Sequence, residues 1–483
     1  MSPRQALIVV LCLFILGCSK EKGPSDAIAR VGNRAIGMRE LERSFALRPE
    51  WKRGATELGA HLAQLDALIA QKLYAQEAER LGLGNDSLIQ RHLRFLKEKE
   101  MMRGLYRKEI REKVTVDEAE ARQMYEWSKK RVDFVYVLSP DSSRCYAAGS
   151  ELLVKPAAAF PLLAESAVRT GRRTAVKIGD LPAGLERLLF GSAVNEIKGP
   201  FRTPGGYMAV KVIGITQEKF LSENEFNLQR QKFENLLTDR KADSLSTLYV
   251  ANLMGDKDLR LNAPVFWTVA DDFFRRVKEE HLDPAGVRSL NITTDELRLL
   301  DADLGKMGDS AVATHRDGAL TVRELMASLE NMPGSLRPRA RTPENLKAAI
   351  GMIVRNQYLT KEAARLGMGE DPGVLFEYEM QKDETLAAAY YERRSVEVRV
   401  TPEEVDAFRK SAGISDEQIF FKLNVGALAR DAKTDSILKW ELPELKSQTR
   451  IECDTVALRS RLKHPDELLA EDPVRVFVRE IFQ

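Results

Sequence analysis

Histidine and cysteine, the residues on which most metal and nucleophilic centres depend, are scarce in this sequence. The 483 residues include five histidines and four cysteines. No HExxH-like pattern, GxSxG elbow or glycine-rich phosphate loop occurs. The histidines are scattered along the chain at positions His61, His92, His281, His315 and His464. We therefore expect no metal and no cofactor, and nothing in the sequence supports a hydrolase, a kinase or a metalloenzyme.

An excess of one charge is also missing. Lysine and arginine number 74 against 72 aspartate and glutamate residues, which gives a net charge of +2. Because no long basic run or dense aromatic-basic patch occurs, we expect no nucleic-acid partner. The length is too great for one hydrophobic core and predicts about three domains.

The first apolar run is too short to span a bilayer, which needs roughly 20 residues. It extends from Ala6 to Gly17 and follows the positive charges of Arg4 and the terminal amine, the pattern of a secretory signal peptide. Ile15-Leu16-Gly17-Cys18 resembles a lipobox, in which the thiol after the cleaved bond accepts a lipid. We expect a signal peptide over 1–17 and lipidation of Cys18; an ordinary secreted protein with an incidental thiol at Cys18 is the alternative.

The residues after Cys18 predict where the chain works. They are polar and lack apolar periodicity, so 18–27 is expected to form a flexible tether at a membrane surface outside the cytoplasm. Ser19, in place of Asp, favours the outer membrane and therefore a lipid-anchored protein on the periplasmic side of the envelope. Cys145 and Cys453 lie far apart without CxxC spacing, which leaves a long-range disulfide open.

An internal repeat is the most informative feature of the chain. Three segments recur at an offset that stays between 284 and 286 residues, and the second copies follow the first in the same order. The matched pairs are 35–41 with 319–325, 77–84 with 362–369, and 114–118 with 400–404. We therefore predict two copies of one module, over 28–130 and 311–412.

Each copy has the patterns of a small helical module. Leu62, Leu65, Leu68, Ile69 and Leu73 recur at three- and four-residue intervals and would line one helix face, as core residues or in part as a groove for a client.

The ends of these helices are marked as well. Gly82 and Gly367 are placed to end helices in the left-handed conformation. New helices are predicted to begin at the capping boxes of Thr115 with Glu118 and of Thr401 with Glu404, the second with Pro402 at its first position.

Between the copies the pattern changes to that of an α+β domain over 131–216. The segments 132–138 and 206–212 are rich in β-branched and aromatic residues and predict strands. The segments 157–168 and 185–190 predict helices between them.

The segment 185–212 resembles the C-terminal half of a parvulin domain. The typical parvulin pattern FExAxFxLKxGExSxPVxTxFGYHIIKV aligns without a gap, and 159–164 resembles the DFxxLA helix of that family. Upstream, 31–41, 68–84 and 114–119 resemble the N-terminal chaperone region of SurA- and PrsA-type foldases. The resemblance implies a peptidyl-prolyl isomerase scaffold, whose chemistry is rotation about X-Pro bonds over a barrier of about 18–20 kcal/mol.

The parvulin resemblance also marks the residues of an active site. Tyr136 and Met208 stand where active members have two histidines of a hydrogen-bonded network, so this resemblance implies weak or lost isomerase activity. Met208 cannot donate a strong hydrogen bond. A proline or peptide pocket would be lined by Leu181, Leu185, Phe190 and Tyr207. Alternatively, Leu185 and Phe190 form with Leu189 only the apolar face of a short helix.

The predicted fold is multidomain and mostly α, with two SurA-like helical modules flanking one parvulin-like α+β domain. In full, we predict a signal peptide over 1–17, a lipidated tether over 18–27, the first module over 28–130, the parvulin-like domain over 131–216, a returning amphipathic helix within 217–262 that packs on the first module, a helical connector over 263–310, the second module over 311–412, and a region of unassigned fold over 413–483, in which 419–428 and 474–481 are strands or short helices.

Three functions fit these predictions. The first is a membrane-anchored chaperone that binds unfolded or nascent envelope proteins, with a parvulin-like domain of weak or lost activity. The second is an active peptidyl-prolyl isomerase with an unusual cleft. The third is a structural lipoprotein that serves as a scaffold in an envelope assembly complex. The sequence does not indicate the oligomeric state.

Overall fold

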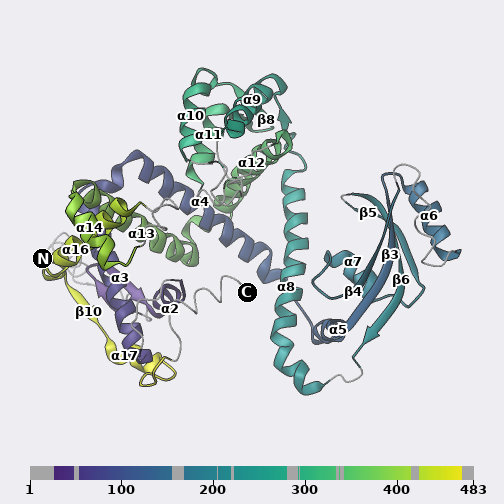
Figure 1. The fold of residues 1–483 in the computed structure, drawn as a ribbon, viewed down its shortest axis with the longest axis horizontal. Coiled ribbons are helices and arrows are strands. Elements are labelled where there is room, and N and C mark those ends of the chain that lie inside the picture. The colour runs from purple at the N-terminus through teal and green to yellow at the C-terminus, as the bar shows by residue number, and fades with distance from the viewer. Residues whose placement is uncertain are drawn as a thin grey trace, which may run out of the picture. The chain divides into compact units, whose positions relative to one another are not determined.

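The computed structural model is mostly helical with three small antiparallel sheets in the residues that it describes. These residues are 27–47, 54–154, 168–203, 205–218, 222–279, 292, 294–332, 337, 342–414 and 424–469. They form two compact units, because the chain divides by its contacts after Gly104 and after Asp258. We call 105–258 the sheet unit, and the described residues before and after it the duplicated unit (Figure 1). The predicted signal peptide, Cys18 and most of the tether lie outside the described residues.

Two segments of the duplicated unit have the same order of elements, as the repeat predicts. The first comprises β1 (Ala27–Val31), β2 (Arg34–Gly37), α2 (Met38–Leu47), α3 (Glu57–Arg80), η1 (Leu83–Asn85) and α4 (Ser87–Glu109), whose last turn belongs to the sheet unit. The second comprises β8 (Ala311–His315), β9 (Gly318–Thr321), α11 (Val322–Asn331), α12 (Pro343–Arg365), η6 (Met368–Glu370) and α13 (Pro372–Glu397). Corresponding elements begin between 284 residues (27 to 311) and 286 residues (57 to 343) apart.

The predicted helix ends at the two glycines are confirmed. Gly82 has φ 71° after α3, and Gly367 has φ 75° after α12. Only a residue without a side chain takes this left-handed conformation readily. The two glycines therefore end equivalent helices.

One of the two predicted capping boxes is confirmed and the other is wrong by two residues. α14 (Pro402–Ser411) begins with Thr401 as its cap and with the Glu404 side chain bonded back to the Thr401 amide. α5 (Glu118–Ser128) does not begin at Thr115, because Asp117 caps it and Glu120 completes the box. Aspartate is a better cap than threonine, and Glu120 stands three residues after it.

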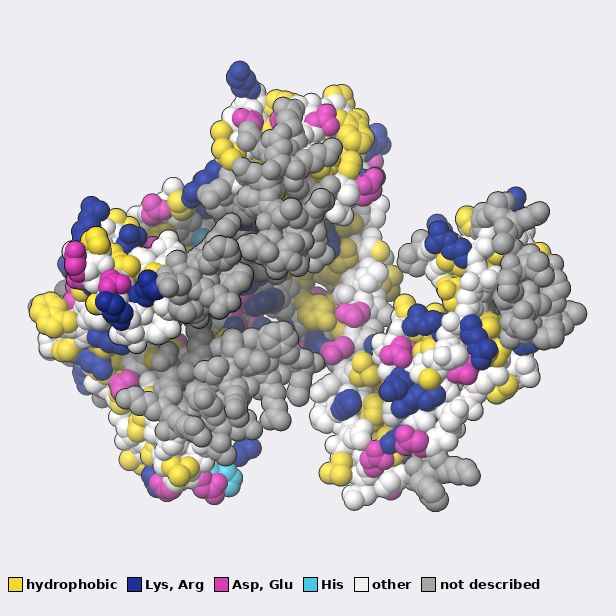
Figure 2. Space-filling model, in the orientation of Figure 1, with side chains coloured by type: hydrophobic (Ala, Val, Ile, Leu, Met, Phe, Trp, Pro, Cys, Tyr) yellow, Lys and Arg dark blue, Asp and Glu magenta, His cyan; other side chains and the backbone are white. Residues whose placement is uncertain are grey.

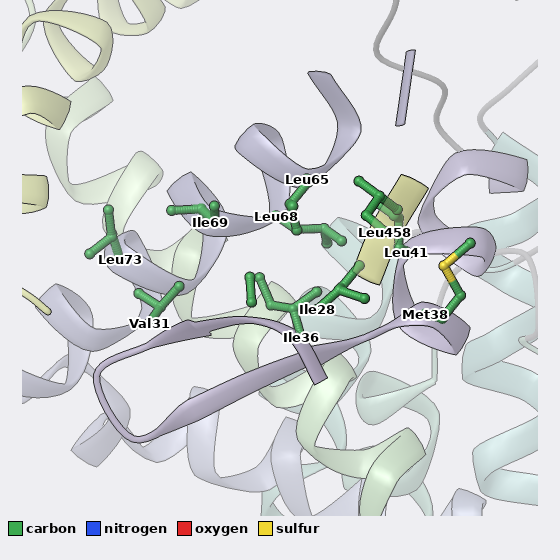
Figure 3. Close-up of a cluster of buried hydrophobic side chains, with 11 residues drawn as sticks. Ile28, Val31, Ile36, Met38, Leu41, Leu65, Leu68, Ile69, Leu73 and Leu458 are labelled. Atoms are coloured by element: carbon green, nitrogen blue, oxygen red, sulfur yellow. The ribbon is translucent and has the colours of Figure 1, made fainter. Parts of the chain in front are cut away.

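The leucine stripe of α3 forms a core with the β1–β2 hairpin (Figure 3). Its buried members Leu65, Leu68, Ile69 and Leu73 are at most 4% exposed, and Leu62 is partly buried beside them. Leu458, from the far end of the chain, is fully buried in the same cluster. The stripe is therefore core, as the sequence predicts.

Each hairpin of the duplicated unit is completed by a strand from elsewhere in the chain. β7 (Arg260–Leu261) pairs antiparallel with β8, and β10 (Ile451–Cys453) pairs antiparallel with β1. Each of these strands leads into a helix, α9 (Ala263–Glu279) after β7 and α17 (Thr455–Arg461) after β10. The Asn262 amide donates to the Val312 carbonyl just as the Asp454 amide donates to the Ile28 carbonyl.

This correspondence gives a structure to part of the region that the sequence left unassigned. α16 (Val425–Gln448) follows α14 and packs on it, whereas α5 is followed first by the α+β domain and then by α8 (Glu223–Met254). The second copy thus continues through a long helix, a short strand and a helix, in the order of the first. Residues 424–428 belong to this helical continuation; 419–423 and 474–481 lie outside the described residues.

The remaining elements of the duplicated unit are α10 (Thr294–Leu304) and η4 (Gly305–Met307), which with α9 make the predicted connector helical. Among the helices that the structure describes, none is both long enough and apolar enough to cross a membrane.

The sheet unit contains a four-stranded antiparallel sheet in the order β4-β3-β6-β5. Its elements are η2 (Arg111–Lys113), α5, β3 (Lys130–Ser139), α6 (Ser142–Val154), β4 (Arg169–Val176), α7 (Ala183–Phe190), β5 (Ile197–Thr203), β6 (Gly206–Gln217) and α8. The predicted strands at 132–138 and 206–212 and the predicted helix at 185–190 are confirmed. The helix predicted at 157–168 lies outside the described residues except for Val168, and α6 was not predicted.

The helices α6 and α7 cover opposite faces of this sheet (Figure 1). One face packs Val132, Phe134 and Val212 against Leu189 and Phe190 of α7. The other face packs residues such as Val135 and Val137 against Cys145 and Ala148 of α6.

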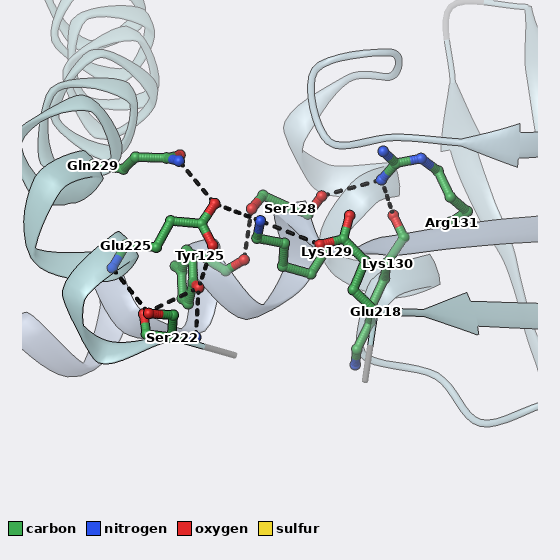
Figure 4. Close-up of polar contacts among 9 residues, drawn as sticks. All are labelled: Tyr125, Ser128, Lys129, Lys130, Arg131, Glu218, Ser222, Glu225 and Gln229. Atoms are coloured by element: carbon green, nitrogen blue, oxygen red, sulfur yellow. Dashed lines mark hydrogen bonds and ion pairs between the residues drawn. The ribbon is translucent and has the colours of Figure 1, made fainter. Parts of the chain in front are cut away.

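A polar cluster joins α5 to the start of α8 (Figure 4). Lys129 lies 2.6 Å from a carboxylate oxygen of Glu225, and the Tyr125 hydroxyl donates to Glu225 and accepts from the Ser222 amide. Below it, Phe226 and Phe233 of α8 are buried against α5. The predicted helix within 217–262 therefore exists and packs on α5, which lies inside 28–130.

Candidate functional site

The two positions that correspond to parvulin histidines lie on one face of the sheet. Tyr136 on β3 and Met208 on β6 both pack on the core beside α7. The strand register sets Tyr136 opposite Val210, and Met208 opposite both Leu138 and Phe201. Because alternate residues of a strand share a face, Tyr136 and Met208 are diagonal neighbours.

The Tyr136 ring lies across the backbone of the edge strand β4. Gly171 is its partner in the ladder, and a Cβ built on Gly171 would lie 2.5 Å from Cζ of Tyr136. The ring centroid is 6.2 Å from that of Phe134 on the same strand. The Tyr136 ring therefore covers β4, which flanks β3 on the side opposite to β6 and Met208, and it needs glycine beneath it.

The chemistry of this surface is apolar. Met208 offers only a weak thioether acceptor, and its partly buried neighbours Phe201 and Leu185 offer none. A twisted prolyl amide is stabilised by groups that bind it more strongly than the planar amide. This face supplies hydrophobic contact and lacks a pair of hydrogen-bonding side chains at the two positions, 136 and 208.

Three of the four predicted pocket residues come together, and the fourth does not. Leu181 and Leu185 are partly buried in the cluster that contains Tyr136 and Met208. Phe190 is 1% exposed and packs against Trp127, with ring centroids 6.3 Å apart, so it is a core residue. Tyr207 lies on the opposite face with Cys145, because residues 207 and 208 point to opposite sides of one strand. Its assignment to the pocket is therefore corrected.

An ion pair that the sequence did not suggest fixes α7. Glu186 is fully buried, and its Oε1 accepts from the amides of Gly179 at 2.6 Å and of Leu181 at 3.3 Å. Its Oε2 lies 2.6 Å from Nη2 of Arg240 on α8. The only hint in the sequence was that Glu186 lies among the apolar residues of 185–190, where a buried carboxylate would need a partner. The contact holds Leu181 and α7 in place.

The turn before β5 contains a residue in the left-handed conformation. Asn195 has φ 69°, which asparagine adopts more readily than most residues with a side chain. Its amide donates to the Val212 carbonyl at 2.8 Å.

The described residues contain no group of three or more histidine, cysteine, aspartate or glutamate side chains that could hold a metal ion. Cys145 and Cys453 are not bonded to each other, since Cys145 is buried in the sheet unit and Cys453 is exposed on β10. Burial raises the pKa of the Cys145 thiol, which makes it a poor nucleophile.

No family model matches the chain, and no curated protein matches it. Among the solved structures that match the chain, one is similar to it at 18% identity, over 47% of this chain and 97% of the other, with a TM-score of 0.21. It comes from work on two proteins of Campylobacter jejuni, the virulence factor PEB4 and the periplasmic protein Cj1289, described there as structurally related SurA-like chaperones. A TM-score this low supports no inference about fold or function.

Proposed function

We propose that the chain is a lipid-anchored chaperone on the periplasmic side of the envelope, attached to the outer membrane, which binds unfolded or nascent envelope proteins. The parvulin-like domain contributes little or no isomerase activity. The observation that carries this proposal is the pairing of Tyr136 and Met208 on an intact sheet, beside a helical module that occurs twice.

Isomerisation and the holding of unfolded chains make different demands on a protein. Isomerisation needs polar groups held closely around a twisted amide, and a misplacement of about 1 Å can reduce the rate on the order of a hundredfold. Holding an unfolded chain needs accessible apolar surface with polar surroundings, and two weak sites on one chain add avidity. On the face drawn in Figure 2, hydrophobic side chains are interspersed with charges of both signs.

A proline-peptide assay on the full mature chain tests the catalytic half of the proposal. We expect a rate far below that of an active parvulin, and a higher rate in the double variant Tyr136→His/Met208→His. Tyr207→His is the matched control, because it places a histidine on the same strand but on the opposite face. A wild-type rate equal to that of an active parvulin would favour the active isomerase.

Pull-down from intact cells tests the holding half. A chaperone should capture many unfolded envelope proteins, whereas a scaffold should capture one partner in a fixed ratio. Capture of one partner in a fixed ratio would contradict the chaperone function and favour a structural lipoprotein.

A further inference from the structure

The duplicated unit contains two grooves at equivalent positions that differ in size. The first lies between α2, α3 and α13 and has a volume of about 140 Å³; the second lies between α4, α11 and α12 and has a volume of about 460 Å³. Six pairs of lining residues correspond through the repeat offset. They are Arg43 with Ala327, Ser44 with Ser328, Leu47 with Asn331, Leu68 with Ile353, Gln71 with Asn356, and Met380 with Phe95. The corresponding groove therefore has a much smaller volume in the first copy than in the second.

Ion pairs join the helices beside the first groove. Nζ of Lys72 lies 2.8 Å from Glu40 and 3.0 Å from Asp383 of the other copy, and all three side chains are at most 6% exposed. Arg34 lies 3.0 Å from the second carboxylate oxygen of Asp383, and Arg43 forms an ion pair with Glu377. These pairs hold α13 along α3, where the two helices pack closely.

The second groove lacks these cations. The repeat offset places Gly318 at the position of Arg34, Gln357 at that of Lys72, and Ala327 at that of Arg43. Glu98 corresponds to Asp383 and lines the groove without a buried cation. Within the described residues α4 does not pack closely along α12, and the open groove separates them.

The lining of the second groove is suited to an extended peptide. It includes four apolar side chains, two of them flexible methionines, and three side-chain amides that can form hydrogen bonds with a peptide backbone. The apolar residues are Phe95, Met102, Met332 and Ile353, and the amides are those of Asn331, Asn356 and Gln357. A volume of about 460 Å³ lies within the usual range of roughly 300–1,000 Å³ for ligand sites.

The charges at the second groove favour an acidic occupant. Arg91, Arg94 and Lys361 are exposed around it, against the single carboxylate of Glu98. Burial raises the pKa of Glu98, and the positive charge of Arg94 opposes that shift. The three cations therefore outnumber the one carboxylate that lines the groove.

We propose that the groove between α4, α11 and α12 binds an acidic, extended segment of an unfolded protein. An apolar side chain of that segment enters between Phe95, Met102 and Met332, and flanking carboxylates meet Arg91, Arg94 and Lys361. The assignment rests on the proposed chaperone function and names the site and the class of segment that it selects.

Two labelled peptides with the same apolar centre, one flanked by aspartate and one by lysine, test this by fluorescence anisotropy with the full mature chain. The acidic peptide should bind more tightly. Arg91→Glu/Arg94→Glu should weaken it by roughly tenfold, since each reversal replaces an attraction by a repulsion at an exposed site.

Two further variants separate charge from shape. Lys347→Glu/Lys439→Glu makes the same change in net charge at exposed positions outside the groove and should leave the affinity unchanged. Ala327→Phe fills the groove without changing its charge and should abolish binding of both peptides.

The outcomes distinguish this site from the wider function. Aggregation suppression with equal binding of both peptides and no effect of Arg91→Glu/Arg94→Glu would overturn the groove assignment and leave the chaperone standing. If the chain neither bound the peptides nor suppressed aggregation, the proposed chaperone function would be wrong as well. A change in self-association caused by the charge reversal, with peptide affinity unchanged, would assign the groove to a second copy of the chain and overturn the proposal.

Discussion

Replacing Lys72 by methionine should weaken the junction between the two copies more than any surface substitution. Lys72 is the shared cation of Glu40 and Asp383, and its side chain is 5% exposed. Methionine keeps the length of the side chain and removes the charge, so two carboxylates remain buried without their main partner. Breaking a buried pair in this way costs about 3–5 kcal/mol.

The pKa shifts agree in direction with this reasoning. Burial raises the pKa of Glu40, and Lys72 opposes that shift, so removal of Lys72 makes a charged Glu40 less favourable. Burial lowers the pKa of Lys72, but its attraction to Glu40 and Asp383 outweighs burial and the net shift is upward. A lysine whose pKa is raised on folding adds stability below its ordinary value of 10.5, and this stability is lost as the pH rises through the folded value.

Urea unfolding of the full mature chain measures the effect, with hydrogen exchange in α13 as the local signal. We expect Lys72→Met to lower the free energy of unfolding. Above about pH 10.5 the stability of the wild type should fall as Lys72 loses its proton, and that of the variant should fall less. The variant Glu40→Gln/Lys72→Met/Asp383→Asn should recover most of the loss, because no unpaired charge remains. A single variant within about 1 kcal/mol of wild type would refute the reasoning, since that is the size of an ordinary exposed pair.

Three further predictions follow from single positions. Gly82→Ala should destabilise the protein by about 1–2 kcal/mol because of its left-handed φ, whereas Gly369→Ala, at a turn without positive φ, should have little effect in the same denaturation experiment. Gly171→Ala should cost about 1–3 kcal/mol by overpacking the Tyr136 ring, and a double-mutant cycle with Tyr136→Ala should show that the two changes are not additive. Metabolic labelling with a fatty-acid analogue should mark the wild type and not Cys18→Ala. Equal labelling of both would show that the predicted lipidation of Cys18 is wrong.

Features fixed by local chemistry could be predicted from the sequence. Gly82, Gly367 and Thr401 act through their own backbone conformation or through a side chain three residues away, so their patterns are visible in a short window. The displaced cap at Asp117 shows the limit of such patterns, because two overlapping capping boxes compete within six residues.

Features that depend on distant partners could not be predicted. The strand β10 has three residues, and it pairs with β1 more than four hundred residues earlier, so no periodicity marks it. Glu186 was hidden because Arg240 lies on another helix, and the assignment of Tyr207 failed because the resemblance does not specify which face each residue takes. The open groove arises from the loss of cations at three separate positions, which only the superposition of both copies makes visible.

The most direct test of the chaperone is aggregation suppression by a chain from which the parvulin-like domain has been removed. Lys130 and Gln217 are paired across β3 and β6, so the ends of the excised segment 131–216 lie side by side and a short glycine-serine linker can join them. If client binding belongs to the duplicated unit, this variant should suppress aggregation of an unfolded outer-membrane protein as well as the intact chain does. Loss of suppression in a variant that keeps the helical content of the duplicated unit would contradict the account.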